Sequence, residues 1–233
     1  AMQSASRTRA QITAAQTSLL AGHDQKLNYL TMADDEVWDE ARLGDAMIAP
    51  NWAGGTKGEL KSRVARLGDF MRLWYPNPHQ EPLPSEAKSL IDGLDGLRPF
   101  HWELEFPEVF VRKNGGFDCI IGNPPFGGKN TISAANSAAY IPMLQALWPH
   151  SHGNSDLCAY FFLRAKEVLR KGGTFGLVAT NTIGQGDMRD TGLKHLVDEG
   201  GIALYDATVD LVGPVSGAAV VVAVVHGEKG KWE

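Results

Sequence analysis

The chain has 233 residues, 43% of them hydrophobic and 21% charged, and a formal net charge of −5. These values predict a globular protein with a substantial core, and they exclude a disordered or fibrous chain. The negative charge also argues against a strong nonspecific grip on nucleic acid by this chain alone, because such binding depends on Lys and Arg.

Helical patterns dominate the first hundred residues. Residues 4–20 are alanine-rich and weakly periodic, and residues 34–48 and 85–97 carry apolar residues at helical spacing. The clearest helix begins at Thr56, because Thr56 and Glu59 have the spacing of a capping box. The apolar residues that follow at helical intervals predict a face that packs in a core. They are Leu60, Val64, Leu67, Met71 and Trp74.

The segment from Phe100 to Phe110 reads Phe-His-Trp-Glu-Leu-Glu-Phe-Pro-Glu-Val-Phe and is dense in aromatic residues. It shows no helical period and contains a proline, a combination that is typical of an extended segment at the edge of a sheet. We therefore expect an edge segment here.

A rigid polar loop follows the next apolar run. Residues 117–122 predict a buried strand, and Asn123-Pro124-Pro125-Phe126 comes directly after it. Open α/β sheets bind their ligands at the carboxyl ends of strands. Both prolines lack an N–H and have a fixed φ, so their carbonyl groups are held in place without a competing donor. The Asn123 side chain adds a second neutral acceptor.

Two neutral acceptors side by side suit an amino group whose lone pair is delocalised into a ring. Hydrogen bonds to both N–H groups would favour the pyramidal, nucleophilic form of an exocyclic base amine. Phe126 offers a flat apolar face on which a flipped base can stack. Gly127 and Gly128 would let the following backbone approach the substrate closely.

The two cysteines of the chain indicate its compartment. Cys119 lies in the predicted strand and Cys158 in a predicted helix, a usage typical of buried, reduced thiols and of a cytoplasmic protein. The longest apolar run, residues 218–225, is too short to span a bilayer, so no membrane is expected as a partner.

The segment of residues 131–148 is rich in Ala and Ser, and it is predicted to form a flap over the polar loop. No metal site is predicted after it, because His150, His152, Asp156 and Cys158 do not have the spacing of zinc ligands.

A helix is expected to start near Asp156, with Asn154 or Ser155 as its cap, and to end at Gly172-Gly173.

A strand over residues 174–179 follows this helix and leads to Asn181. Strand, helix and strand in this order predict a right-handed parallel crossover, which places Asn181 at the same sheet edge as Asn123. Residues 201–206 and 218–225 predict two further strands.

At residues 123–126 the sequence resembles the amino-methyltransferases that use S-adenosylmethionine, whose motif is (Asn/Asp/Ser)-Pro-Pro-(Tyr/Phe/Trp). The form with Asn and Phe resembles the DNA adenine-N6 branch most. Large bacterial DNA adenine methyltransferases of restriction-modification and phage-exclusion systems have a block similar to residues 100–110 shortly before this motif. The resemblance covers residues 100–226.

The resemblance implies an α/β fold that contains the carboxyl-terminal half of a class I methyltransferase (Rossmann-like) sheet, preceded by a helical region. It implies S-adenosylmethionine as cofactor, double-stranded DNA as partner, and association with restriction or phage-exclusion subunits. The implied catalytic residues are Asn123, Pro124, Pro125 and Phe126, of which Asn123 and Pro124 also border the cofactor. The substrate pocket is expected to include Gly127, Gly128, Lys129 and Asn181.

The Gly-rich loop on which the cofactor site of this family depends is not found before residue 117. We therefore expect an internal fragment of a larger enzyme, inactive by itself. Residues 1–99 would be a helical insertion, and residues 100–233 the catalytic half of the methyltransferase domain.

Two other functions stay open. Asn-Pro-Pro-(Tyr/Phe) also serves methyltransferases of protein glutamine and of guanine N2 in ribosomal RNA, although these lack the block at residues 100–110. The third hypothesis is a non-catalytic interaction module whose helical first half contacts other subunits.

Overall fold

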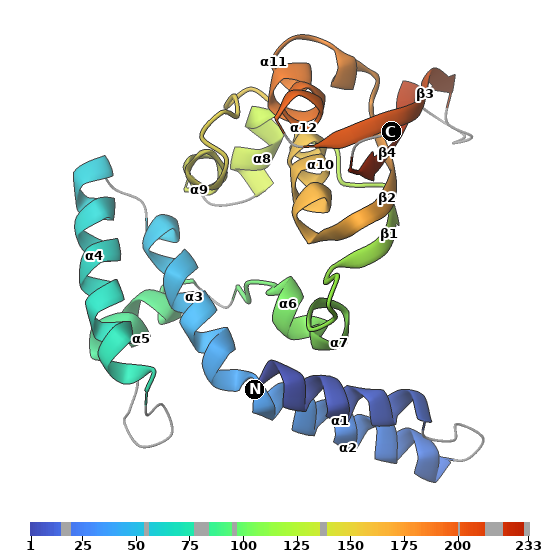
Figure 1. Cartoon of the computed structure of the whole chain (residues 1–233). Coiled ribbons are helices and arrows are strands. Elements are labelled where there is room, and N and C mark those ends of the chain that lie inside the picture. The colour runs from blue at the N-terminus through green and yellow to red at the C-terminus, as the bar shows by residue number, and fades with distance from the viewer. Residues whose placement is uncertain are drawn as a thin grey trace. The chain divides into compact units, whose positions relative to one another are not determined.

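The computed structural model describes residues 1–14, 20–53, 56–76, 84–94, 97–135, 139–199, 201–212 and 221–230. These residues form two compact units, Ala1–Lys113 and Asn114–Glu233, coloured blue to green and green to red in Figure 1. No helix of the described residues is long and apolar enough to cross a membrane.

The first unit is made of helices. They are α1 (Met2–Ala14), α2 (Leu20–Glu36), α3 (Trp38–Trp52), α4 (Lys57–Trp74), α5 (Ser85–Asp92), α6 (Trp102–Glu105) and α7 (Pro107–Phe110). Helices α1 and α2 lie side by side (Figure 1). The prediction of one helix over residues 34–48 was wrong, because Val37, with φ −112° and ψ 9°, separates α2 from α3. Part of the predicted helix over 4–20, residues 15–19, lies outside the described residues.

The capping box at the start of α4 is confirmed. Glu59 N donates to Thr56 Oγ1 over 3.3 Å, and Thr56 N donates to Glu59 Oε2 over 2.7 Å. The expected core is confirmed for Leu67, Met71 and Trp74, which are buried against α3 and α5. Helix α4 therefore has the apolar face that its periodicity predicted.

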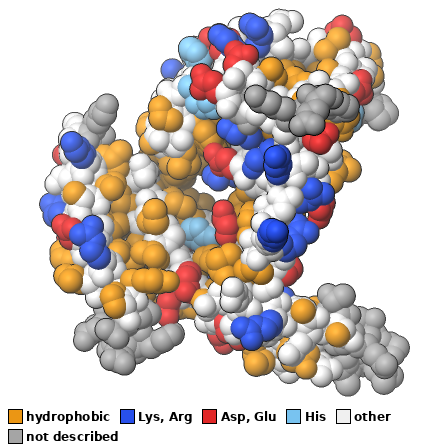
Figure 2. All heavy atoms as spheres, viewed as in Figure 1, with side chains coloured by type: hydrophobic (Ala, Val, Ile, Leu, Met, Phe, Trp, Pro, Cys, Tyr) orange, Lys and Arg blue, Asp and Glu red, His pale blue; other side chains and the backbone are white. Residues whose placement is uncertain are grey.

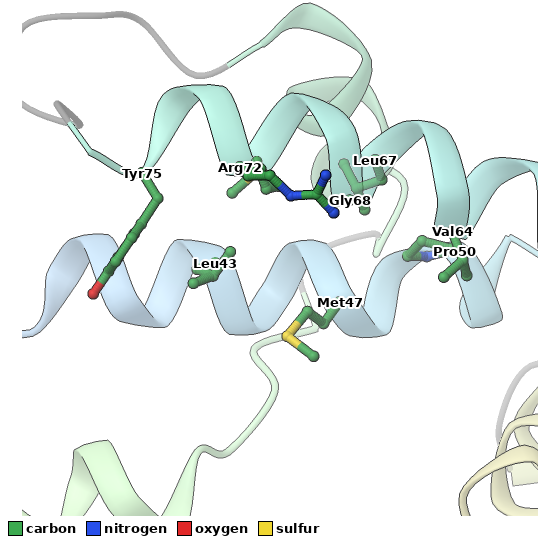
Figure 3. A pocket seen from close by; sticks show the side chains of 9 residues that line it. Leu43, Met47, Pro50, Val64, Leu67, Gly68, Arg72 and Tyr75 are labelled. Atoms are coloured by element: carbon green, nitrogen blue, oxygen red, sulfur yellow. The ribbon is translucent and has the colours of Figure 1, made fainter.

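Part of that face also lines an open groove between α3 and α4. Val64, which was expected in the core, is 47% exposed. It lies with Met47 along a groove of about 380 Å³ (Figure 3). The other lining residues are Leu43, Pro50, Leu67, Gly68, Met71, Arg72 and Tyr75. Figure 2 shows hydrophobic side chains at the surface of this unit.

The segment 100–110 is helical, so the prediction of an extended edge segment was wrong. Pro107 opens α7, at a helix position where no backbone donor is needed. The aromatic residues pack on one another and not across a sheet: the ring centroids of Phe100 and Trp102 are 5.0 Å apart. His101 Nε2 lies 3.0 Å from Asp45 Oδ1, within hydrogen-bonding distance, and ties the segment to α3.

The second unit is a sheet with helices packed on it. Its helices are α8 (Lys129–Ala135), α9 (Tyr140–Leu147), α10 (Leu157–Val168), η1 (Asn181–Gly184), α11 (Gly186–Arg189), η2 (Asp190–Lys194) and α12 (His195–Asp198). Its strands are β1 (Phe117–Gly122), β2 (Leu169–Thr180), β3 (Ile202–Val212) and β4 (Val221–Lys229). The described strands lie in the order β1-β2-β4-β3.

Pairing in the sheet confirms that the two strands of the predicted crossover are parallel. β1 and β2 are parallel, and α10 connects them and packs against β2 (Figure 1). Phe162 of α10 and Phe175 of β2 are both fully buried and meet edge to face, with ring centroids 5.6 Å apart. β4 runs antiparallel to both β2 and β3. The first residues of the predicted last strand, 218–220, lie outside the described residues.

The long helix starts near Asp156 as predicted, but its predicted cap and its predicted end were wrong. Asp156, not Asn154 or Ser155, caps α10, and α10 ends at Val168. The pair Gly172-Gly173 bulges β2 instead of ending the helix. Phe117 of β1 pairs with Leu169 of β2, and Cys119, two residues later, pairs with Thr174, five residues later in β2. The extra residues of β2 form the bulge. Gly172 accommodates the bulge with φ +73°, a conformation that favours glycine.

Two stacked histidine rings join the segment before α10 to α12. The ring centroids of His150 and His195 are 3.5 Å apart, with an interplanar angle of 17°. The pKa of His150 is lowered, first by burial, then by the charges of His195 and Lys166, against opposing effects of the Thr191 backbone and of Glu199. The folded state therefore favours the neutral ring.

We expect the second unit to lose stability as the pH falls below about 6.5, the ordinary pKa of His150. Unfolded chains take up a proton there before the folded chain does, so protonation favours unfolding. A His150→Gln variant, which cannot titrate, should lose less stability than the wild type between pH 7.5 and 5.5 in urea unfolding. The stability of each protein at pH 7.5 serves as its own reference, so that a loss of packing caused by the substitution itself does not enter the comparison. Equal curves for wild type and His150→Gln would contradict the expectation.

Candidate active site

The polar loop predicted from the sequence leaves the sheet at the carboxyl end of β1. Strand β1 ends at Gly122, and residues 123–128 have no regular structure before α8 starts at Lys129. Asn123 and Pro125 are exposed, whereas Pro124 is buried. Burial of one proline fixes the loop to the unit, and the amide of Asn123 faces solvent, where it can accept hydrogen bonds from a ligand.

Phe126 is half-buried and packs against the main core of the second unit. That core is formed by α9, α10, β2, β3, β4 and the helices after β2, and its fully buried members include Phe162, Leu163 and Phe175. The core therefore fixes one side of the Phe126 ring, and the remaining exposed part of the ring is available for stacking.

Two hydrogen bonds connect the loop to the start of α10. Gly127 N donates to Asp156 Oδ2 over 2.9 Å, and Leu157 N donates to the Gly127 carbonyl over 2.8 Å. The other oxygen of Asp156 accepts from Cys158 N over 3.0 Å and caps α10. Asp156 was not predicted to have a role in the site, although a short acidic side chain directly before an apolar helical run is the ordinary signal of a cap.

Gly127 and Gly128 have room for a side chain. Neither has a positive φ, an added Cβ on Gly128 would meet nothing within 4 Å, and one on Gly127 would make ordinary contacts with Thr131 from 3.5 Å. Internal packing therefore gives no reason for glycine at these positions. Lys129 is exposed at the start of α8.

Asn181 follows β2, at the same sheet edge as Asn123, because β1 and β2 are parallel. Its amide holds Asp210 of β3: Asn181 Nδ2 donates to Asp210 Oδ1 over 2.7 Å, and Asp210 N donates to Asn181 Oδ1 over 2.9 Å. Asp210 has φ +56° and lies in an irregular part of the β3–β4 ladder. In this structure the Asn181 amide thus supports the neighbouring strand.

Strand β1 is more exposed than a parallel strand usually is. Parallel sheets are ordinarily covered on both faces. Ile121 is 84% exposed, and β1 has β2 as its one partner among the described strands. The predicted burial of Cys119 was therefore wrong, whereas Cys158 of α10 is buried as expected. Burial raises the pKa of the Cys158 thiol to about 12, so this thiol stays protonated.

A family model of Eco57I restriction-modification methylases matches residues 72–199, which is more than half of the chain. A putative type II restriction enzyme and methyltransferase of Methanocaldococcus jannaschii is 27% identical over 96 residues, which are 41% of this chain and 7% of that protein. Among solved structures, the Type IIL restriction-modification enzyme MmeI in complex with DNA matches with a TM-score of 0.41 and 24% identity, over 49% of this chain and 16% of that one. The chain thus spans a small part of the length of either relative. The matched region includes the whole polar loop and α10, and the chain belongs to the Eco57I restriction-modification methylase family.

Proposed function

We propose that this chain carries the target-base side of the active site of a DNA methyltransferase that methylates adenine at N6. The observation that carries the proposal is the loop Asn123-Pro124-Pro125-Phe126 at the carboxyl end of a parallel strand, in a chain of this family. The whole protein would act on double-stranded DNA, in association with a restriction or phage-exclusion system.

The chemistry of the loop suits an amine that must become nucleophilic. The exposed Asn123 carbonyl and the Pro124 carbonyl would accept hydrogen bonds from the two N–H groups of a flipped adenine. The open space at Gly128 leaves room for the base beside the loop. Phe126, fixed on one side by the core, would stack on the base and hold its amine in place.

S-adenosylmethionine, held mainly by other parts of the whole protein, would supply an electrophilic methyl group. The adenine amine would gain positive charge as it takes up this group, and it would then lose a proton to solvent water. Neutral hydrogen-bond acceptors suit this order of steps, because they bind the amine before methyl transfer and stabilise the positive charge that develops on it. Asn123 and Pro124 would be the residues of this chain that border the transferred methyl group.

Most of the cofactor site would come from other parts of the whole protein. In the described part of residues 1–116 every regular element is a helix, so no strand leads to a Gly-rich loop there. The exposed β1 supports this proposal, because a parallel strand from a cofactor-binding half could pair with it and cover Ile121. The sheet would then be the carboxyl-terminal half of a class I methyltransferase sheet, with residues 1–99 as an inserted helical region.

The test is chemical analysis of DNA from cells that carry the intact gene. We expect N6-methyladenine at specific sites, and its loss in an Asn123→Ala strain. The same cells allow the competing acceptors to be examined by mass spectrometry of ribosomal RNA and of proteins. N2-methylguanine or methylglutamine that depends on Asn123, with unmodified adenine, would overturn the proposal in favour of those acceptors. Absence of all three modifications would favour a non-catalytic interaction module.

A further inference from the structure

One carboxylate joins the polar loop to the helix behind it. The two oxygens of Asp156 accept from two different backbone donors, Gly127 N over 2.9 Å and Cys158 N over 3.0 Å. In return, Leu157 N donates to the Gly127 carbonyl over 2.8 Å. Both backbone polar groups of Gly127 are therefore held by the cap and the first residue of α10, Asp156 and Leu157.

The loop has few backbone N–H groups through which it can be held in place. Pro124 and Pro125 have no N–H, so the donors of the loop after Asn123 begin at Phe126. Gly127 comes directly after the ring that would stack on the base. A fixed Gly127 consequently limits how far Phe126 and the Pro124 carbonyl can shift.

The residues around Asp156 are fixed in turn by a buried polar network. Ser155 is 1% exposed, and its hydroxyl lies 2.7 Å from Thr191 Oγ1 and donates to the Asp187 carbonyl over 3.1 Å. Thr191 is fully buried and accepts from His152 N over 2.9 Å. A satisfied buried network of this kind holds a single geometry. Asp156 thus holds the loop from a rigid support.

We propose that Asp156 is a positioning residue for methyl transfer, which it serves by holding Gly127 and, through it, the base-binding loop. This inference rests on the proposed function. A carboxylate is required because two donors need two acceptor oxygens. Asparagine offers one oxygen and turns an NH₂ group toward the second donor, and serine offers a single hydroxyl oxygen.

Asn and Ser each offer one acceptor oxygen where Asp156 offers two. Substitution by either residue can therefore separate the effect of Asp156 on the loop from its effect on the helix. Asn and Ser are both good caps, so Asp156→Asn and Asp156→Ser should preserve α10 and the melting temperature. Both variants should release Gly127. In the whole protein we expect single-turnover methyl transfer to slow by about 10²-fold, the cost of a misplaced reacting group. The KM for DNA and for S-adenosylmethionine should stay close to the wild-type values.

Amide hydrogen exchange adds a measurement that does not depend on activity. Peptides that cover residues 123–128 should exchange faster in Asp156→Ser than in the wild type, whereas peptides from the middle of α10 should not. Asp198→Asn is the matched control, because Asp198 is an exposed acid at the end of α12. This control should behave as the wild type in every measurement.

Wild-type transfer rates in both Asp156 variants, or unchanged exchange at residues 123–128, would overturn the inference. A transfer rate that falls only in step with the melting temperature would also overturn the inference, because Asp156 would then act only as a helix cap. A wild-type protein that transfers no methyl group to DNA would instead refute the proposed function. Faster exchange in Asp156→Ser would even then show that Asp156 holds the loop.

Discussion

Replacement of Asn123 by Ala is expected to lower the rate of methyl transfer in the whole protein by about 10²–10³-fold, the usual cost of removing one oriented acceptor or donor from a reaction centre. The fold should be unaffected, because Asn123 is exposed and a surface truncation changes stability by no more than about 0.5 kcal/mol. The rate is measured in a single turnover with labelled S-adenosylmethionine, and stability by urea unfolding.

Two further variants make this result specific. Asn123→Asp keeps acceptor oxygens at the same place, so it should retain more activity than Asn123→Ala. Asn114→Ala is the matched control, because Asn114 is an exposed asparagine before the amino end of β1, where its side chain donates to the Lys171 carbonyl over 3.1 Å. An Asn123→Ala protein that transfers methyl groups at the wild-type rate would exclude Asn123 from the reaction.

Local signals in the sequence predicted the elements that depend on neighbouring residues. The capping box of Thr56 and Glu59 needs a separation of three residues, and the structure contains it. The crossover from β1 through α10 to β2 follows from the change from an apolar run to a helical period, and the parallel pairing confirms it. The position of residues 123–126 after a strand was predicted for the same reason.

Elements decided by distant partners were not predictable in this way. Phe100 to Phe110 reads as an extended segment, yet it is helical, and His101 meets Asp45, 56 residues earlier. Gly172-Gly173 has the signature of a helix end, but the backbone of β1 accommodates it as a bulge in β2. Each local pattern allowed two structures, and contacts far along the chain selected one of them.

The same distinction applies to the candidate site. A four-residue motif identifies the loop, but the residue that holds it, Asp156, is 29 positions further on and is recognisable only once Gly127 lies beside α10. Asn181 was expected beside the substrate from the topology alone. Its hydrogen bonds to Asp210 depend on the irregular ladder between β3 and β4, which no periodicity indicates.

The junction before β1 should tolerate no side chain. Gly116 has φ +120°, and a Cβ there would lie 2.4 Å from Arg170 N, 2.7 Å from the carbonyl carbon of Leu169 and 2.8 Å from the Val168 oxygen. All three are backbone atoms at the end of α10 and the start of β2, so they cannot move aside as a side chain could. We expect Gly116→Ala to destabilise the second unit by at least about 3 kcal/mol, through strain and displacement of the β1–β2 pair.

Urea unfolding followed by fluorescence measures this loss, with Gly184→Ala as the matched control. Gly184 lies in η1 of the same unit, has no positive φ, and an added Cβ would meet nothing within 4 Å. Its replacement should change stability by no more than about 0.5 kcal/mol. Equal midpoints for the two variants would contradict the close approach at Gly116. A large difference would show that the backbone path into β1 is fixed by its close approach to the end of α10, the helix whose other end is hydrogen-bonded to the polar loop.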